Sequence, residues 1–507
     1  MLRWTAANVR ATATVALFAV ASPFSFWALN APRGASPWGP LLVGSVAVGV
    51  GFILLSVLGR RLEPDRAAAV VSVFLLAAFN WRVFGDPLYE LVESVPRDLA
   101  PIPAVLLVGF LVWRFSSRRE VHLSLLVMGT VMVGSSLVSL GIWYSGEQAL
   151  PPSSLFEPTP WEAPPGDVHV IVLDGYARDD VLDLLYGFDN SSFVAALERN
   201  GFVVPSEAHS NYTSTIASLS SALLGDYPQL TELRLTDRER VAAHAVLGGA
   251  NPVIEAFRRS GYRYVHVEGG WIAGSCGSGV DECVGSTLLD EAMWALAERS
   301  ALGWWFERSY GHAFSRNALR ALEDLTALEN GPLDGGRLIL THVILPHPPL
   351  LISNTCSIRF LPELTGDAIG HPSYSDDLMA ARRLAYVEQV ECVNSRILEF
   401  LEYVEEEDVV IMFGDHGPDS FGQLTMDPSL WTAEQIWERL AIFASIKLPG
   451  CPNSVPDDWS PVNGLRSAIR CLSGDQVSDV DDRMFIFPID AAPGIVTEVA
   501  VEYAGRR

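Results

Sequence analysis

The chain has 507 residues, of which 49% are hydrophobic and 19% are charged. This composition excludes an intrinsically disordered chain, a collagen-like chain and a small disulfide scaffold. Charge is divided unevenly, because residues 1–150 carry 11 Arg against 8 acidic residues whereas the rest carries 24 Lys and Arg against 52 acidic residues. An acidic body repels phosphate backbones, which argues against nucleic acid as a partner.

The first 145 residues contain apolar segments that predict a bundle of five transmembrane helices. These segments are residues 11–29, 40–58, 67–81, 99–113 and 121–143. A spanning helix needs about 20 apolar residues, a length that the first, second and fifth segments approach or reach. The third and fourth are shorter and end at Arg82 and Arg114, whose long side chains can reach the membrane surface. We expect the first segment to be a retained span rather than a cleaved signal peptide, because four more apolar stretches follow.

Arginines at the ends of these segments predict the orientation in a plasma membrane of the bacterial type. One side carries Arg3, Arg10, Arg60, Arg61, Arg66, Arg114, Arg118 and Arg119, whereas the other has Arg33 and Arg97. Positively charged loops stay in the cytoplasm, so we expect a cytoplasmic N-terminus. Five crossings then place everything beyond residue 145 outside, and the loss of one weak span would reverse this parity.

All six cysteines lie beyond the apolar segments, at 276, 283, 356, 392, 451 and 471. An even set confined to this part of the chain is typical of disulfides formed in an oxidising compartment. We expect nearest neighbours to pair, as Cys276–Cys283, Cys356–Cys392 and Cys451–Cys471. Free buried thiols are the alternative, and the lack of a C-x-x-C motif disfavours a zinc site.

Residues 146–166 are rich in proline and predict an extended linker between a membrane domain, residues 1–145, and a soluble domain, residues 167–507. Beyond the linker, short β-rich runs alternate with longer helical patterns. The expected strands are Val168–Leu173, Tyr262–Val267, Arg337–Val343, Val409–Phe413 and Leu440–Ile446, and the expected helices are 214–224, 252–260, 286–300, 315–328 and 377–402. This alternation predicts an α/β/α sandwich with a mainly parallel sheet, in which ligands bind beyond the carboxyl ends of the strands.

Two expected strands run directly into acidic residues. The first is followed by Asp174, and the strand Val409–Phe413 is followed by Gly414-Asp415-His416-Gly417. An adjacent carboxylate and imidazole can bind the same divalent cation, and glycines let the chain turn sharply beside the ion. Taken alone, Asp174 also fits a turn cap, and the pair Asp415-His416 also fits a solvent-exposed loop.

A third strand contributes two histidines. His342 lies within the strand, where a satisfied core histidine is the alternative, and His347 lies in the loop Pro346-His347-Pro348-Pro349. Prolines on both sides hold His347 rigidly, which suits a ligand or an acid–base group.

The segment His209–Gly225 begins with polar residues and continues as a helix of small residues. A hydroxyl at the start of such a helix is either a cap or a nucleophile at the positive end of the helix dipole. Asn211-Tyr212-Thr213 also matches the N-glycosylation sequon, a short pattern that often arises by chance.

In chain order, Leu-Asp-Gly at 173–175, Thr-x-x-Ser at 215–218, His-x4-His-Pro-Pro at 342–349 and Gly-Asp-His-Gly at 414–417 resemble the alkaline phosphatase/sulfatase superfamily. With the apolar segments in front, the chain looks most like its membrane-anchored branch, which includes lipoteichoic acid synthases and phosphoethanolamine transferases. The resemblance covers residues 167 to about 450. It implies a membrane-bound, metal-dependent phosphotransferase that moves a phospho-headgroup from a membrane lipid to an envelope lipid or glycan. A hydrolase of phosphate or sulfate esters and an inactive envelope scaffold are the alternatives.

The resemblance also implies a role for each motif residue. Asp174, Asp415 and His416 are expected to hold one divalent ion, zinc or manganese before calcium or magnesium. Thr215 is expected to be a further ligand and the nucleophile that forms a phospho-threonine intermediate, with Thr213 as the second choice.

Four other residues are expected near the substrate. His347 and His342 are implied to face it, with His347 in acid–base catalysis, and Arg178 and Asn211 are candidates to bind it. A surface helix charge is the alternative for Arg178.

Two departures from the superfamily pattern narrow the expected activity and the expected number of metal ions. Thr215 stands where sulfatases have cysteine or serine, and Ala217 and Leu219 replace the proline and arginine of that motif. These replacements exclude formylglycine formation and disfavour a sulfatase. No histidine follows His416, so the last histidine of a two-zinc site is missing and a single ion is expected.

Overall fold

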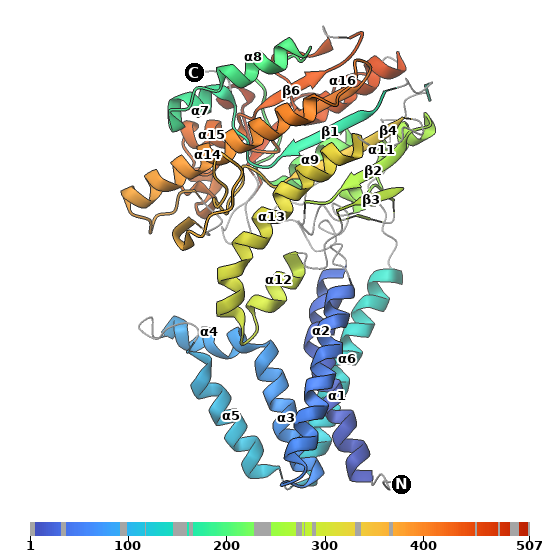
Figure 1. Ribbon diagram of the computed structural model, residues 1–507, viewed down its shortest axis with the longest axis vertical. Coiled ribbons are helices and arrows are strands. Elements are labelled where there is room, and N and C mark those ends of the chain that lie inside the picture. Colours follow the sequence, from blue (N-terminus) through green and yellow to red (C-terminus); the bar gives the residue numbers. More distant parts are fainter. Residues whose placement is uncertain are drawn as a thin grey trace. The chain divides into compact units, whose positions relative to one another are not determined.

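The computed structural model describes residues 6–31, 37–91, 99–116, 118–145, 160–161, 166–227, 245–269, 276–277, 279–285, 291–329, 336–364, 369–451, 454–474, 477–486 and 496–504. The chain divides into two compact units, residues 1–147 with 288–310, and residues 148–287 with 311–507 (Figure 1). Residues 288–310 thus group with the N-terminal helices, although they lie in the sequence range predicted to be soluble. Most of the predicted linker at 146–166 lies outside the described residues.

The N-terminal part of the first unit is helical. Its elements are α1 (Ala6–Asn30), α2 (Trp38–Leu58), α3 (Pro64–Phe79), α4 (Trp81–Leu91), α5 (Pro101–Phe115) and α6 (Arg119–Ser145). Among the described residues, α1, α2 and α6 are long and apolar enough to span a membrane, and α3 with α4 adds a fourth span if this pair, bent by 65°, counts as one. The predicted count of five is therefore not confirmed.

The third and fourth predicted segments each have a local feature that keeps them from forming one long spanning helix. The third segment is interrupted at Asn80, whose Nδ2 donates to the carbonyl of Leu76 and to Ser22 Oγ of α1. The fourth forms α5, which has only 15 residues. Small side chains, among them Ala11, Ala47 and Ala68, let α1, α2 and α3 pack closely around one apolar core.

A later segment of the chain completes the first unit. It consists of α12 (Glu291–Glu298) and the first residues of α13 (Gly303–Glu329). The Ala301 amide donates to the carbonyl of Ala78 at 2.7 Å, and the Arg82 amide donates to the carbonyl of Arg299 at 3.2 Å. These bonds attach the segment at the break between α3 and α4.

The second unit is built on a six-stranded sheet in the order β3-β2-β4-β1-β5-β6. The strands are β1 (Val168–Leu173), β2 (Arg263–Val267), β3 (Glu282–Val284), β4 (Arg337–Val343), β5 (Val409–Phe413) and β6 (Ala444–Lys447). All neighbours pair in parallel except β6, which runs antiparallel to β5, so the sheet is mixed. The four predicted strands from 168 to 413 are confirmed within a residue, and the short edge strand β3 was not predicted.

Helices cover both faces of this sheet (Figure 1). Ile171 and Leu173 of β1 share one core with α7 (Asp179–Tyr186), α8 (Ser191–Arg199), α13 and α14 (Asp376–Leu401). Val170 and Val172 share the other core with α9 (Thr215–Leu224), α11 (Pro252–Arg259) and α16 (Pro461–Ser473). Successive strand residues alternate between the faces, so the even-numbered residues of β1 and β4 lie on the face that α9 covers.

A smaller C-terminal element consists of β7 (Met484–Ile486) and β8 (Thr497–Val499), paired in antiparallel fashion. Met484 and Ile486 pack on α15 (Ala433–Leu440). The predicted nearest-neighbour disulfides are confirmed, as Cys276–Cys283, Cys356–Cys392 and Cys451–Cys471.

Candidate metal centre

Three adjacent parallel strands, β4, β1 and β5, bring the predicted motifs together at their carboxyl ends. Asp174 directly follows β1, and Asp415 lies two residues beyond β5. The Gly175 amide donates to Asp415 Oδ1 at 3.1 Å, so the two turns are joined by a hydrogen bond. Both carboxylates are almost completely buried, at 4% and 0% exposure.

Each carboxylate keeps one oxygen without a hydrogen-bond partner among the described residues. These atoms are Asp174 Oδ1 and Asp415 Oδ2. Ligand atoms of Asp174, Asp415 and His342 lie within 4.8 Å of one another. A buried carboxylate oxygen without a hydrogen bond is costly unless a cation neutralises it, so this donor set fits a divalent metal ion.

His416 presents one defined nitrogen to this cluster. Its Nδ1 lies 3.0 Å from the carbonyl oxygen of Gly417, and since a carbonyl only accepts, Nδ1 carries the proton. Burial lowers the pKa of His416 well below its usual value, so the ring is neutral and Nε2 has a free lone pair. This Nε2 lies 3.3 Å from Asp415 Oδ2 and 3.6 Å from Asp174 Oδ1, which is the orientation that a metal ligand needs.

Thr215 is the first residue of α9, and its Oγ1 lies 3.1 Å from His416 Nε2. The helix start therefore delivers a hydroxyl to the carboxylate cluster. Thr213, the second choice, is fully buried, and its carbonyl is bound by a side chain of α15. Ser210 joins the loop before α9 to the turn after β5, because its Oγ donates to the carbonyl of Asp415 at 2.5 Å.

His342 lies among the candidate metal ligands, next to Asp174 and Asp415. It pairs with Val172 in the register of β4 and β1, which puts it on the sheet face that α9 covers. Its Nε2 lies 3.3 Å from Asp174 Oδ2, and the residue is 2% exposed. His342 is therefore placed to contribute an imidazole to the metal-ligand group, whereas the sequence predicted that it faces the substrate.

His347 lies at the edge of the same site. Its ring centroid is 6.3 Å from that of His416, and its Nδ1 is 2.6 Å from the carbonyl oxygen of Pro348. That carbonyl fixes the proton on Nδ1 and leaves Nε2 as the atom that exchanges protons. His347 shares a small cavity with Asp419 and Arg439.

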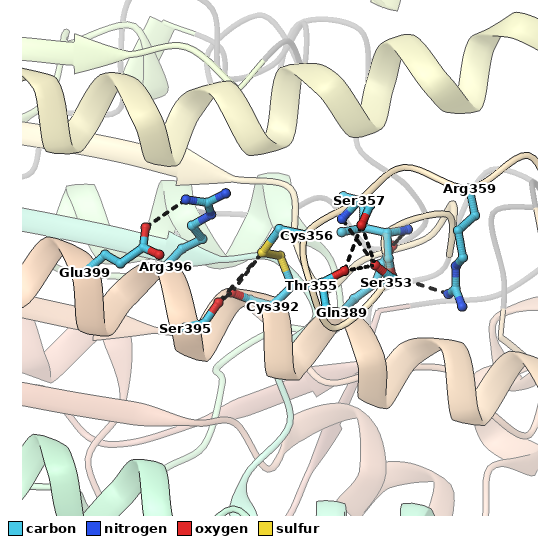
Figure 2. Close-up of a disulfide and its surroundings, with 11 residues drawn as sticks. Ser353, Thr355, Cys356, Ser357, Arg359, Gln389, Cys392, Ser395, Arg396 and Glu399 are labelled. Atoms are coloured by element: carbon cyan, nitrogen blue, oxygen red, sulfur yellow. Dashed lines mark hydrogen bonds and ion pairs between the residues drawn. A yellow bond between two sulfur atoms is a disulfide. The ribbon is translucent and has the colours of Figure 1, made fainter.

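The loop that carries His347 is held from α14 by a residue that the sequence did not reveal. Gln389 is fully buried, and its Nε2 donates to the carbonyls of Pro346 and His347 at 3.0 and 3.2 Å. Its Oε1 accepts from the Ile352 amide. Figure 2 shows Gln389 on the same helix as Cys392, whose disulfide to Cys356 ties the continuation of this loop to α14.

The electrostatics of the paired carboxylates also fit a cation. Burial and the neighbouring charge of Asp174 raise the pKa of Asp415 to about 6. Burial also opposes ionisation of Asp174, but His347, His342 and His416 outweigh it and hold the pKa of Asp174 below its usual range. Two adjacent buried carboxylates resist ionising together, and a divalent cation removes that conflict.

The structure does not bring Arg178 and Asn211 to the centre. The Arg178 guanidinium forms two hydrogen bonds to Asp180 at 2.8 Å and one to the carbonyl of Ala208. Asn211 is fully buried, and its Nδ2 donates to Asp482 while its Oδ1 accepts from the Val462 amide. Both side chains thus have structural partners, and their predicted contacts with substrate stay predictions.

No protein-family model matches the sequence, and no curated protein matches it. Solved structures do match. The integral membrane lipooligosaccharide phosphoethanolamine transferase A of Neisseria meningitidis is 13% identical, with 91% of this chain and 95% of that chain covered and a TM-score of 0.34. The periplasmic domain of EcEptC from Escherichia coli, in complex with Zn, is 11% identical, with 68% and 96% covered and a TM-score of 0.40.

A phosphonate monoester hydrolase of Agrobacterium radiobacter is 13% identical, with 63% of this chain and 80% of that chain covered and a TM-score of 0.41.

Proposed function

We propose that this chain is a membrane-bound, metal-dependent phosphotransferase that moves a phospho-headgroup from a lipid to an envelope lipid or glycan. The observation that carries the proposal is the position of Thr215. Its hydroxyl lies 3.1 Å from His416 Nε2 and beside two buried carboxylates that each keep an oxygen without a hydrogen bond. A nucleophile at a helix start, next to a divalent-ion donor set, is an arrangement suited to attack on phosphorus.

Asp174, Asp415 and His416 would hold the ion, with Thr215 Oγ1 and His342 Nε2 beside them. A bound divalent cation such as zinc or manganese lowers the pKa of the Thr215 hydroxyl and neutralises charge on a phosphate oxygen. Thr215 Oγ1, having released its proton to solvent, attacks the phosphorus of the donor headgroup, and the bond from phosphorus to the donor's lipid oxygen breaks. The headgroup phosphate is then esterified to Thr215.

His347 supplies the proton transfers in this proposal. His347 Nδ1 stays hydrogen-bonded to the carbonyl of Pro348, so Nε2 is the nitrogen that gives a proton to the departing lipid oxygen. In the second half, the same Nε2 takes the proton from the acceptor hydroxyl as that oxygen attacks phosphorus. The bond from phosphorus to Thr215 breaks, and both side chains return to their starting states.

The apolar helices of the first unit favour a lipid donor. Among the described residues, three helices, or four if the bent pair counts as one span, are long and apolar enough to cross a membrane, where headgroups are abundant. The three disulfides favour an extracytoplasmic site. A hydrolase that uses water as the acceptor would keep the same first half-reaction.

The test is the intact mass and metal content of the full chain, purified in detergent and incubated with mixed bacterial phospholipids. We expect a bound divalent ion and an adduct of headgroup mass that maps to Thr215. Thr215→Ala should abolish the adduct, whereas Thr213→Ala should keep it. An adduct that survives Thr215→Ala, or a wild-type chain that binds no metal, would contradict the proposal.

A second measurement separates the transferase from the hydrolase. The adduct should decay slowly in buffer and faster when a hydroxylated envelope lipid or glycan fraction is added, with transfer of the headgroup mass to that fraction. Decay at one rate regardless of the acceptor would favour the hydrolase.

A further inference from the structure

Arg439 is a buried arginine at the end of α15 that no sequence motif marks. It is 5% exposed, and its guanidinium donates to backbone carbonyls in two different segments. Nε and Nη2 donate to the carbonyl of Thr213 at 3.1 and 2.9 Å, and Nη1 donates to the carbonyl of Gly417 at 2.6 Å. One planar side chain thereby joins the loop before α9 to the turn after β5.

The contact with the turn acts directly on the orientation of His416. The Gly417 carbonyl accepts from Arg439 Nη1 and also from His416 Nδ1, so its position sets the direction of the imidazole. The Gly417 amide in turn donates to the carbonyl of Arg439 at 2.7 Å. A side chain on Gly417 would collide with the backbone carbonyl of Glu438, which explains why glycine is needed here for close approach.

The contact with the loop acts on the nucleophile. Thr213 lies two residues before Thr215, and the bond between its carbonyl and Arg439 fixes the chain just ahead of the helix start. From the other side, the Thr213 amide donates to the carbonyl of Phe485 in β7. The two ends of the Thr215–His416 contact are therefore held by the same guanidinium.

We propose that Arg439 is the positioning residue of the candidate centre, which sets the distance between Thr215 Oγ1 and His416 Nε2 by holding both backbone segments. The inference rests on the proposed function, because it assumes that these atoms serve a metal-dependent nucleophile. It assigns Arg439 no contact with substrate. Removal of a group that orients a metal ligand costs about 10- to 100-fold in metal affinity or activity.

Arg466 of α16 provides a matched control. It is 4% exposed, and its guanidinium also donates to backbone carbonyls, those of Gly225 at 2.6 Å and Ser478 at 2.7 Å. Gly225 lies at the opposite end of α9 from Thr215. Arg466 therefore has the same chemistry and a similar exposure, but its bond to α9 is at the end of the helix that carries no residue of the centre.

The experiment compares Arg439→Lys, Arg439→Met and Arg466→Met in the full chain, purified in detergent. Zinc affinity is measured by competition with a chromophoric chelator, and kcat and KM for headgroup transfer are measured separately. We expect both Arg439 variants to bind zinc about 10- to 100-fold more weakly. We also expect kcat to fall with little change in KM. The lysine variant should bind zinc as weakly, because a single ammonium lacks the planar fork with which Arg439 bonds both carbonyls. Arg466→Met should keep zinc affinity within about twofold.

The outcomes separate this inference from the proposed function. If the wild-type chain binds zinc and forms the Thr215 adduct while the Arg439 variants match it in zinc affinity and kcat, the inference is wrong and the function stands. Equal losses in the Arg439 and Arg466 variants would also overturn it, because they would reflect general destabilisation. A wild-type chain without zinc or adduct would refute the proposed function instead. If Arg439→Met does not fold, Arg439→Lys carries the comparison.

Discussion

At the scale of single residues, buried acids outside the centre lie close to Arg439, among them Glu438. Glu438, next to Arg439, is fully buried and accepts hydrogen bonds from the Ser420 amide, Gln423 Nε2 and the Tyr186 hydroxyl. Burial raises the pKa of Glu438 to about 7. Its carboxyl therefore keeps a proton in the folded chain at a pH where the unfolded chain has already released it.

This difference predicts how stability depends on pH. The contribution from Glu438 is fully present below the carboxyl's ordinary pKa near 4.5 and is lost as the pH rises through about 7. The difference is worth up to about 3 kcal/mol. We expect Glu438→Gln to flatten the fall in thermal midpoint between pH 5 and pH 8, since the Gln423 amide can turn its oxygen toward the new amide. The exposed Glu434 of the same helix gives the control Glu434→Gln, and an unchanged slope in Glu438→Gln would refute the assignment.

At the scale of elements, α14 contacts two parts of the candidate centre. Tyr386 donates to the carbonyl of Gly175 beside Asp174, and Gln389 holds the loop of His347, the proposed proton-transfer residue. Gln389 has its hydrogen bonds to Pro346, His347 and Ile352, and the disulfide Cys356–Cys392 fastens the same stretch one turn further along. We expect Gln389→Leu to lower kcat about 100-fold, because a misplaced acid–base group loses its alignment. Zinc affinity should not change, in contrast to the Arg439 variants.

Two of the disulfides can be compared, Cys356–Cys392 next to the His347 loop and Cys451–Cys471 elsewhere in the chain. Replacing both Cys356 and Cys392 by serine should lower kcat as well as stability, whereas the same change at Cys451 and Cys471 should lower stability alone. Loss of a native disulfide costs about 2–5 kcal/mol. The thermal midpoints and the kcat values of the two double variants provide the measurement. Equal kcat in both would show that the loop does not need its covalent attachment.

Much of this element-level picture could be predicted from the sequence. Buried strands such as Val168–Leu173 and Val409–Phe413 are continuous apolar runs, and their carboxyl ends point to the residues that meet in space. Asp174, Thr215, Asp415 and His416 come together for that reason. Gln389 and Arg439 could not be found in this way, because each sits in an ordinary helical pattern and acts through backbone carbonyls that only the tertiary fold places nearby.

For a related reason, the sequence could not give the contacts of Arg178, Asn211 and His342. Arg178 and Asn211 were chosen for their closeness in sequence to Asp174 and Thr215, yet the fold turns their side chains toward Asp180 and Asp482. His342 was expected to face the substrate, but the alternation of β4 points it to the carboxylates under α9. Sequence proximity locates a segment, whereas strand alternation and helix packing decide what each side chain contacts.

At the scale of the whole molecule, the disulfides constrain how often the chain crosses the membrane. The bend of 65° between α3 and α4 fits either a broken span or a re-entrant pair. With a cytoplasmic N-terminus, a broken span keeps the second unit outside only if α5 also crosses, which makes five crossings. A re-entrant pair with α1, α2 and α6 as the spans makes three crossings and also places the second unit outside. Four crossings would place it in the cytoplasm, where its three disulfides would be unfavourable. The oxidised cysteines therefore favour three or five crossings over four.

Because all six native cysteines are paired, a single added cysteine would be the only free thiol and can report the topology. Glu63, exposed before α3, and Leu99, 53% exposed before α5, lie on either side of the bent pair. In spheroplasts we expect an impermeant maleimide to label Leu99→Cys directly and Glu63→Cys only after permeabilisation. Labelling of both from the same side would make the bent pair re-entrant. It would also require a different path for α5 or α6 to keep the disulfides in an oxidising compartment.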